Sequence, residues 1–157
     1  MVALPPGTSP SSNARRPPLS AEDQSPKSSP DERGRALLEI SNAMVGLYKE
    51  QFGRGPTRAR TYWAGPDIVV SVLEDTLTPA ERNMVALGEH ERLRDMRVFF
   101  QYATVTEFCT PVERITGRRV RSFHSSIDTA VDGMAIETFV LYRQGEDGPS
   151  RAELPGV

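Results

Sequence analysis

The stretch Leu77-Thr78-Pro79-Ala80-Glu81, continuing to Ile115-Thr116-Gly117, decides the organisation of this chain. Thr78 is suited to cap a helix, because its hydroxyl can accept a hydrogen bond from a free backbone N–H of the first turn. Glu81 can reach back to the N–H of Thr78, and Pro79 stands where a missing N–H does no harm. Gly117 supplies the left-handed residue that commonly ends a helix. The stretch therefore predicts a long helical segment.

The apolar pattern inside this segment is interrupted. A charged run from Glu89 to Arg97 is followed by an apolar stripe at helical spacing from Val98 to Ile115. Pro111 lies within the stripe and predicts a kink or a restart, because proline lacks an N–H and clashes with the preceding turn. Thr110-Pro111-Val112-Glu113 repeats the capping pattern, which is consistent with a short second helix from this point.

The segments before and after the long helix predict one further helix and two hairpins. Residues 36–52 carry apolar side chains at helical spacing and end at Gly53-Arg54-Gly55-Pro56, a helix stop. Alternating or β-branched patterns predict four strands. Their ranges are 57–63, 68–74, 119–127 and 134–142. The second of them is apolar on both parities, which indicates a central position antiparallel to the first.

The element order helix–hairpin–helix–hairpin predicts an α+β fold. Two amphipathic helices and four strands bury their apolar surfaces most simply as a four-stranded antiparallel sheet with the two main helices on one face. The opposite sheet face would then meet solvent or a partner. Each half has a helix ending in glycine, a basic first strand and an apolar second strand, which suggests a loose internal duplication.

Composition divides the chain into three parts. Residues 1–32 hold more than half of the 13 prolines and many serines, so we expect a disordered tail. Residues 33–143 form the predicted folded domain, and residues 144–157 are expected to be loose. A formal charge of −2 argues against strong attraction to nucleic acid or to an anionic membrane. No apolar run is long enough for a membrane span and no signal peptide is evident, which predicts a soluble, cytoplasmic protein.

Several of these features occur together in the order found in a known family. They are Phe52-Gly53-Arg54-Gly55-Pro56, the strand Ile68–Leu73, Leu77-Thr78-Pro79-Ala80-Glu81, Arg97, Val112-Glu113 to Thr116-Gly117-Arg118, Val120, Asp128 and Glu137-Thr138-Phe139-Val140-Leu141. Together they resemble the MpsC-like domain family. This family is named for a component of a sodium-translocating, membrane-potential-generating system that is also linked to inorganic-carbon supply.

The resemblance implies a small cytoplasmic α+β domain with an accessory role beside a membrane transporter. It also implies structural roles for a set of positions that match the family pattern. These are Gly53, Gly55, Pro56, Thr78, Pro79, Glu81, Gly117 and Phe139.

Two residues are candidates for ligand binding. Arg97 joins the charged run to the apolar stripe and could bind an anion such as bicarbonate, phosphate or a carboxylate. It could equally pair with helical neighbours, of which the chain offers Glu89, Asp95 and Glu107. Asp128 lies four residues from His124, but a metal site needs three or four ligands, so we expect no metal and interpret Asp128 as a turn former.

Basic residues on the first strand of each hairpin are candidates for a partner surface. Arg58, Arg60 and Arg121 could lie on one positive sheet face together with Arg118 and Arg119. Single-strand RNA binders add aromatic stacking surfaces, for which Tyr62, Phe123 or Tyr142 would serve. No RNA-binding motif is present, so a solvated or dimerising face is favoured and no nucleic-acid partner is expected.

No catalytic arrangement emerges from the residue pattern. Ser125 and Ser126 adjoin His124, but neighbours on a strand point to opposite faces. The single cysteine, Cys109, lies in an apolar stretch and is interpreted as a buried packing thiol. We therefore expect no enzyme activity and no cofactor. The leading hypothesis is an accessory or regulatory module that contacts a membrane transporter subunit. A homodimer formed through the open sheet face is compatible with this role. The alternative is a small-molecule or anion-sensing domain independent of a transporter.

Overall fold

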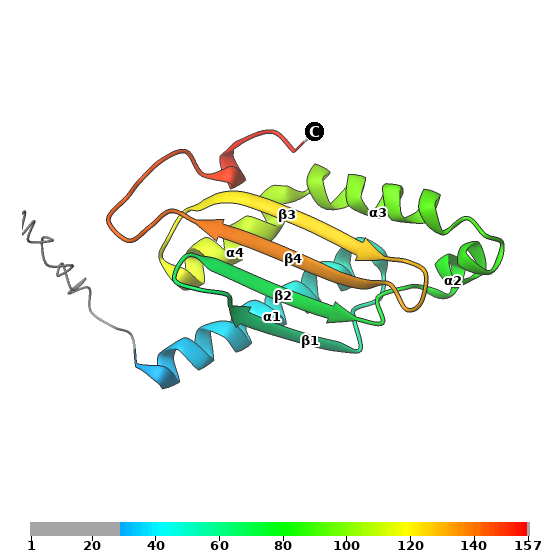
Figure 1. Ribbon diagram of the computed structural model, residues 1–157, viewed down its shortest axis with the longest axis horizontal. Helices are drawn as coiled ribbons and strands as arrows, with labels where there is room; N and C mark the ends of the chain where they lie inside the picture. Colours follow the sequence, from blue (N-terminus) through cyan, green and yellow to red (C-terminus); the bar gives the residue numbers. More distant parts are fainter. Residues whose placement is uncertain (1–28, 157) are drawn as a thin grey trace, which may run out of the picture.

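The computed structural model describes residues 29–156, and its elements follow the predicted order (Figure 1). A helix and a hairpin are followed by three shorter helices, a second hairpin and a 3₁₀ turn. The elements are α1 (Pro30–Phe52), β1 (Arg58–Trp63), β2 (Ile68–Glu74), α2 (Pro79–Ala86), α3 (His90–Ala103), α4 (Val105–Thr116), β3 (Val120–Asp128), β4 (Met134–Leu141) and η1 (Arg151–Glu153).

The four strands form one antiparallel sheet in the order β1-β2-β4-β3, which confirms the predicted α+β fold. The central position of β2 is confirmed as well. Each hairpin places its second strand in the middle of the sheet, where β2 pairs with β4, so β1 and β3 become the two edges. The register of β3 shifts between Val120 and Ser122, which leaves Arg121 at a bulge.

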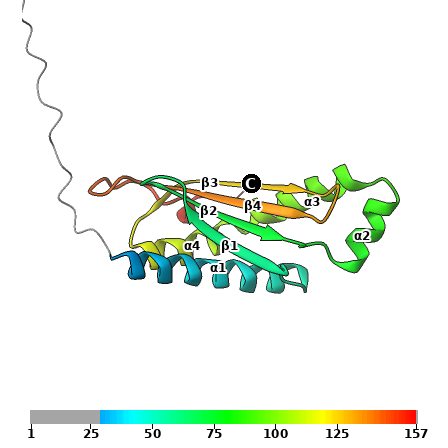
Figure 2. The ribbon, with the colours of Figure 1, turned by 60° about the horizontal axis from the view of Figure 1, so that its bottom comes forward.

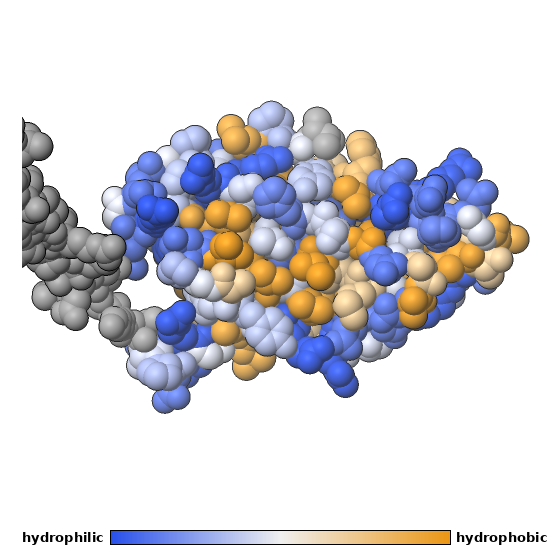
Figure 3. All heavy atoms as spheres, viewed as in Figure 1, coloured by the Kyte–Doolittle hydropathy of each residue, from blue (hydrophilic) through white to orange (hydrophobic). Residues whose placement is uncertain are grey.

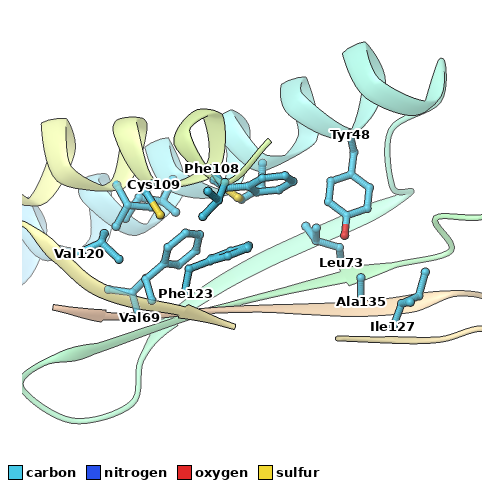
Figure 4. Close-up of a cluster of buried hydrophobic side chains, with 14 of the residues drawn as sticks. Tyr48, Val69, Leu73, Phe108, Cys109, Val120, Phe123, Ile127 and Ala135 are labelled. Atoms are coloured by element: carbon cyan, nitrogen blue, oxygen red, sulfur yellow. The ribbon is translucent and has the colours of Figure 1, made fainter. Parts of the chain in front are cut away.

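The helices pack on one face of the sheet. In Figure 2, α1 and α4 lie together beneath the sheet, and α2 stands at one end of the molecule. Figure 4 shows side chains from α1 and α4 meeting those of the strands. The largest fully buried apolar side chains of this core are those of Ile40, Met44, Tyr48, Leu73, Leu77, Leu93, Phe108, Phe139 and Leu141.

The predicted helix caps are confirmed. The Thr78 side chain accepts a hydrogen bond from the N–H of Glu81, and the N–H of Thr78 donates to the Glu81 carboxylate. Gly53 ends α1 with φ 73°, and Gly117 ends α4 with φ 67°. Both values are left-handed, where a side chain is disfavoured.

The long helical segment is three helices, whereas the sequence predicted one helix with a kink or restart at Pro111. The first break is at Gly88, whose φ of 81° closes α2 while its N–H donates to Val85 and that of Glu89 donates to Met84. Such paired bonds form a Schellman motif. The second break is at Thr104, and Pro111 lies inside α4 without ending it. The predicted restart at Pro111 is therefore wrong, because the chain has already turned at Thr104.

Ordered structure continues beyond both ends of residues 33–143. Ser29 and Glu32 form a capping box at the start of α1, so Pro30, Asp31 and Glu32 are helical. The remainder of the predicted disordered tail, residues 1–28, lies outside the described residues. After β4, the side chain of Ser150 is buried and donates to Glu113 of α4 at 2.5 Å, so the segment expected to be loose packs on the domain.

Candidate functional site

A row of polar residues crosses the helix-covered face of the sheet, with one residue from each strand. Thr61 of β1 is paired with Ser71 of β2, Ser71 with Glu137 of β4, and Glu137 with Ser125 of β3. Ser71 and Glu137 are fully buried. We call these four residues the polar row. Its position is unusual, because the middle of a covered sheet face is normally apolar.

Side chains from two helices donate hydrogen bonds to one carboxylate oxygen of Glu137. The Tyr48 hydroxyl of α1 points toward the sheet (Figure 4) and donates to Oε1 of Glu137 at 2.7 Å. Nε2 of Gln101, on α3, donates to the Tyr48 oxygen at 2.7 Å and to Oε1 of Glu137 at 3.0 Å. The Ser125 hydroxyl donates to Oε1 of Gln101 at 2.6 Å. These bonds connect α1 and α3 to the two strands of the second hairpin.

The other end of the polar row is tied to α1. The hydroxyls of Ser41 and Thr61 are 2.8 Å apart, and those of Thr61 and Ser71 are 2.9 Å apart. Ser41 also bonds the Leu37 carbonyl at 3.0 Å. Buried hydroxyls need such partners, because an unpaired one carries a desolvation penalty of about 1–3 kcal/mol.

Arg97, the predicted anion-binding residue, is completely buried beside this network. Its Nε and Nη2 donate to the two carboxylate oxygens of Glu81, each at 2.6 Å, and Nη2 also donates to the Thr76 carbonyl at 2.9 Å. The guanidinium lies 3.6 Å from the ring centre of Phe52, close enough for a cation–π contact. Arg97 therefore holds α2, α3 and the end of α1 together.

The ion partner of Arg97 differs from the three helical neighbours that were weighed, Glu89, Asp95 and Glu107. The partner is Glu81 of α2, because the chain turns at Gly88 and folds α2 back toward α3. Glu81 thus has two roles, as the N3 residue of its own helix cap and as the counter-ion of Arg97.

Four buried side-chain polar atoms have no hydrogen-bond partner within residues 29–156, and two of the four belong to Arg97 and Glu137. These two are Nη1 of Arg97, a donor, and Oε2 of Glu137, an acceptor. Both belong to side chains with 0% exposure. The buried polar side chains around Arg97 and Glu137 therefore keep one unused donor and one unused acceptor.

The surroundings change the acidity of three groups. Burial raises the pKa of Glu137 to about 7, although the Tyr48 hydrogen bond acts in the opposite direction. Burial and the neighbouring Glu137 raise the pKa of Tyr48 well above its usual value. Burial also opposes ionisation of Glu81, but hydrogen bonds from Arg97 and Thr78 outweigh it and lower the Glu81 pKa. Glu81 is therefore the ionised partner, whereas Glu137 titrates near neutrality.

Glu137 and its partners were missed as functional candidates by sequence reasoning. The signal was present: on β4, Glu137 shares its parity with Ala135, Phe139 and Leu141, all of which are buried. A carboxylate on the buried parity of a strand indicates a polar contact in the core, because buried carboxylates are paired or hydrogen-bonded. Tyr48 and Gln101 could not be assigned in this way, since each fits an ordinary helix stripe.

Asp128 and His124 lie on the face of the sheet opposite to this network. Oδ1 of Asp128 accepts from the N–H of Ala130 at 3.0 Å, as a turn former does. His124 shares a 2.8 Å hydrogen bond with Ser122. Within residues 29–156, no group of three or more His, Cys, Asp or Glu side chains could hold a metal ion. Because Asp128 lies on the opposite face, the structure does not bring it together with Arg97.

The predicted partner residues Arg58, Arg60 and Arg121 do not form one surface. β1 and β3 are opposite edges of the sheet, so the apolar central strands separate Arg121 from the other two. Arg58 and Arg60 both pair with Glu74, the former at 3.6 Å. Phe123, weighed as a stacking surface, is buried against Phe108.

The face of the sheet opposite the helices is uncovered in the described part of the chain (Figure 2). Its central strands present half-buried or exposed apolar side chains, and Figure 3 shows hydrophobic atoms gathered over the middle of this face with hydrophilic ones around them. We call it the open face. Its central apolar residues are Ile68, Val70, Val72, Met134, Ile136 and Val140.

Cys109 is fully buried in the core, and burial is the largest of the causes that raise the pKa of its thiol to about 12. The interpretation as a buried packing thiol is therefore confirmed. None of the helices in the described residues combines the length and the apolar character that a membrane crossing requires.

Comparison with known proteins agrees with the resemblance seen in the motifs. No curated protein and no solved structure gives a significant match. Residues 32–143 match the family described as Na+-translocating membrane potential-generating system (MpsC). The match includes all four strands and all of α1 to α4 except the first two residues of α1. The chain therefore belongs to the MpsC family.

Proposed function

We propose that the protein is a non-enzymatic accessory or regulatory module that works in the cytoplasm through protein–protein contact. Its target would be a cation-translocating, membrane-potential-generating or inorganic-carbon supply system. The family membership supports the link to a membrane system, and the absence of a spanning helix from the described residues fits a role beside a transporter.

The observation that carries the contact role is the open face. A sheet with helices on one side normally turns a polar surface to solvent on the other. Here Ile136 on the central strand β4 is 37% exposed, and Met134 at the start of that strand is 39% exposed. Tyr62 on the edge strand β1 is 47% exposed. Exposed apolar patches rimmed by polar residues mark protein interaction sites. Arg58 and Arg60 border this patch on β1 and supply a charged rim.

Affinity capture of the tagged full chain from its own cells in mild detergent tests the proposal. The wild type should recover a membrane cation or inorganic-carbon transport protein. Arg58→Glu/Arg60→Glu should lose it, because the reversed charges lie at the rim of the open face. The control is Arg92→Glu/Arg94→Glu, an equal charge change at exposed positions of α3.

Capture that persists in the control but fails in the β1 variant supports the proposal. Recovery of no membrane transport protein by the wild type overturns it. Equal loss in both variants also overturns the placement on the open face, since it would show a general charge effect.

A second candidate function, sensing of a small molecule or an anion, is favoured by one observation. Nη1 of Arg97 is buried and has no partner within the described residues. An anion that reached it would gain a charge-assisted hydrogen bond. A thermal-shift screen with bicarbonate, phosphate and carboxylates tests this function. A stabilising hit that disappears in Arg97→Lys supports it, because lysine keeps the charge but not the fork of donors.

A further inference from the structure

The charge on the open face changes from one edge strand to the other. The register places Arg60, Val72, Ile136 and Ser126 on one transverse row, and Tyr62, Val70, Thr138 and His124 on the next. The row at the end of the sheet has Arg58 paired with Glu74 on one side and Asp128 paired with Met134 on the other. The β1 edge is thus basic, the β3 edge carries an acid, and the middle is apolar.

A hollow lies at the acidic end of the open face. It has a volume of about 570 Å³ and is formed by the end of β3, the β3–β4 turn and the start of β4. Asp128 and Asp132 contribute carboxylates to its lining, and Val131, Met134 and Ile136 contribute apolar surface. Such a lining suits a long basic side chain, whose methylene stem packs on apolar groups while its charged end meets a carboxylate.

This arrangement is self-complementary under a single symmetry operation. A twofold axis that runs parallel to the strands, between two stacked sheets, places β1 of one copy over β3 of the other and β2 over β4. It keeps each transverse row opposite the same row of the partner. Arg58 then faces the hollow beside Asp128, and Tyr62 faces His124. On the central strands, Val72 faces Ile136 and Val70 faces Thr138. A twofold axis perpendicular to the strands would instead place β1 over β1 and bring like charges together.

We propose that the occupant of the open face is a second copy of this chain, stacked sheet to sheet about an axis parallel to the strands, with Arg58 of each copy in the acidic hollow of the other. This inference rests on the proposed role of the open face as a protein contact surface. A twofold interface uses the same patch on both copies, so the patch must be complementary to itself. A patch that is basic at one edge, apolar in the middle and acidic at the other edge is self-complementary in this way. The membrane partner would then bind the dimer, and the charge reversals on β1 would lose that partner by breaking the dimer.

The size of the face sets the expected strength. Four strands about 4.8 Å apart and seven residues long cover a projected area of roughly 450 Å², which is near the lower end for specific interfaces. The side chain of Arg58 is 65% exposed, and its ion pair with Glu74 is long at 3.6 Å, so it is available to reach across. We expect a dimer with a dissociation constant in the micromolar range.

Sedimentation velocity of the purified full chain from about 1 to 300 μM tests self-association without any membrane partner. The wild type should convert from monomer to dimer within this range. Ile136→Lys, a charge in the middle of the open face, should stay monomeric. Phe99→Lys is the control, because it replaces an exposed apolar residue on α3, away from the open face, and should dimerise as the wild type does. Circular dichroism melts verify that each variant is folded.

Charge reversal tests the pairing. Arg58→Glu and Asp128→Lys should each weaken the dimer roughly ten-fold, since every change occurs twice in a symmetric interface. The double variant should recover to within about two-fold of the wild type, because opposite charges again face each other. A double variant as weak as the singles overturns the pairing of Arg58 with Asp128.

Crosslinking tests the direction of the axis. A mixture of Tyr62→Cys and His124→Cys chains should be joined by a short bismaleimide, whereas either variant alone should not. The native Cys109 does not interfere because it is buried. Crosslinking of Tyr62→Cys with itself overturns the proposed axis. A wild type that is monomeric at every concentration overturns the dimer and assigns the face to a different protein, while leaving the capture of a transport protein as a separate result.

Discussion

The hydroxyl of Tyr48 donates a 2.7 Å hydrogen bond to Oε1 of Glu137, a residue 89 positions further along the chain. Tyr48 belongs to the first helix and Glu137 to the last strand, so this bond closes the domain from end to end. Gln101 contacts both residues and thereby adds the third helix. A polar cluster therefore specifies how the helices sit on the sheet, while the surrounding apolar core supplies most of the burial.

Replacing Glu137 should change how stability depends on pH. The folded-state pKa of about 7 lies above the usual value of 4.5 for a glutamate side chain, so the folded protein retains a proton that the unfolded chain has released. Stability therefore falls as the pH rises from about 4.5 to about 7 and stays reduced above it. Glu137→Gln mimics the protonated form and should lack this loss, which amounts to roughly 3 kcal/mol.

The measurement is urea denaturation of both proteins at pH 4.5, 6 and 7.5. The free energy of unfolding of Glu137→Gln relative to the wild type should increase across this range. Parallel pH profiles of the two proteins would contradict the raised pKa, because other titrating groups are common to both.

The Arg97–Glu81 pair should show strong coupling. Removing one partner leaves the other charge buried, so Arg97→Met or Glu81→Gln alone should destabilise the protein by about 3–5 kcal/mol. Glutamine at position 81 still serves the helix cap, so Glu81→Gln reports mainly the lost charge. The double variant should be less destabilised than the sum of the single variants. Strictly additive values in a double-mutant cycle would show that the two side chains do not interact.

Two glycine substitutions should have opposite effects. Gly117→Ala should destabilise the protein by about 1–2 kcal/mol, because Gly117 has φ 67° at the end of α4. Gly46→Ala should stabilise it by about 0.8–1 kcal/mol, since alanine favours a helix interior. A Cβ at Gly46 would meet no atom within 4 Å apart from the neighbouring backbone of its own helix, so nothing packed against α1 opposes it sterically. Thermal unfolding of both variants beside the wild type provides the comparison, and a destabilising Gly46→Ala would contradict the expected packing.

Cys109 should be unreactive in the folded protein. It is fully buried, and a thiol with a pKa of about 12 forms almost no thiolate at neutral pH. A chromogenic disulfide reagent should detect no thiol in the native protein at pH 7.5 and one thiol after denaturation in guanidinium chloride. Rapid labelling of the native protein would show that α4 opens readily from the sheet.

Local signals account for the parts of the fold that were predicted correctly. The ranges predicted for β1 to β4 agree with the structure within about one residue at each end, because alternation of side chains has a direct steric consequence in a strand. The caps at Thr78 and Gly117 were equally clear. The break at Gly88 had a local signal too, a glycine after an apolar turn, but the charged residues beyond it suggested that the helix continued.

The candidate site was predictable only in part. Arg97 stood out because a charge at the border of an apolar stripe is unusual, yet its partner Glu81 lies on a different helix and depends on the turn between them. The basic residues of β1 and β3 lie at two different edges of the sheet because of the strand order. The sequence patterns of single strands do not determine that order.

The sequence by itself determined the first helix, the strands and the caps at Thr78 and Gly117, because these depend on side-chain periodicity and on the backbone preferences of Gly, Pro and Thr. Tertiary structure alone decided the order of the strands, and with it the row from Thr61 to Ser125 and the placement of Arg58 opposite Asp128 across the open face. The physical reason is that these contacts join residues far apart in the chain. Their energy depends on burial and pairing, which exist only after the sheet has assembled and the helices have covered one of its faces.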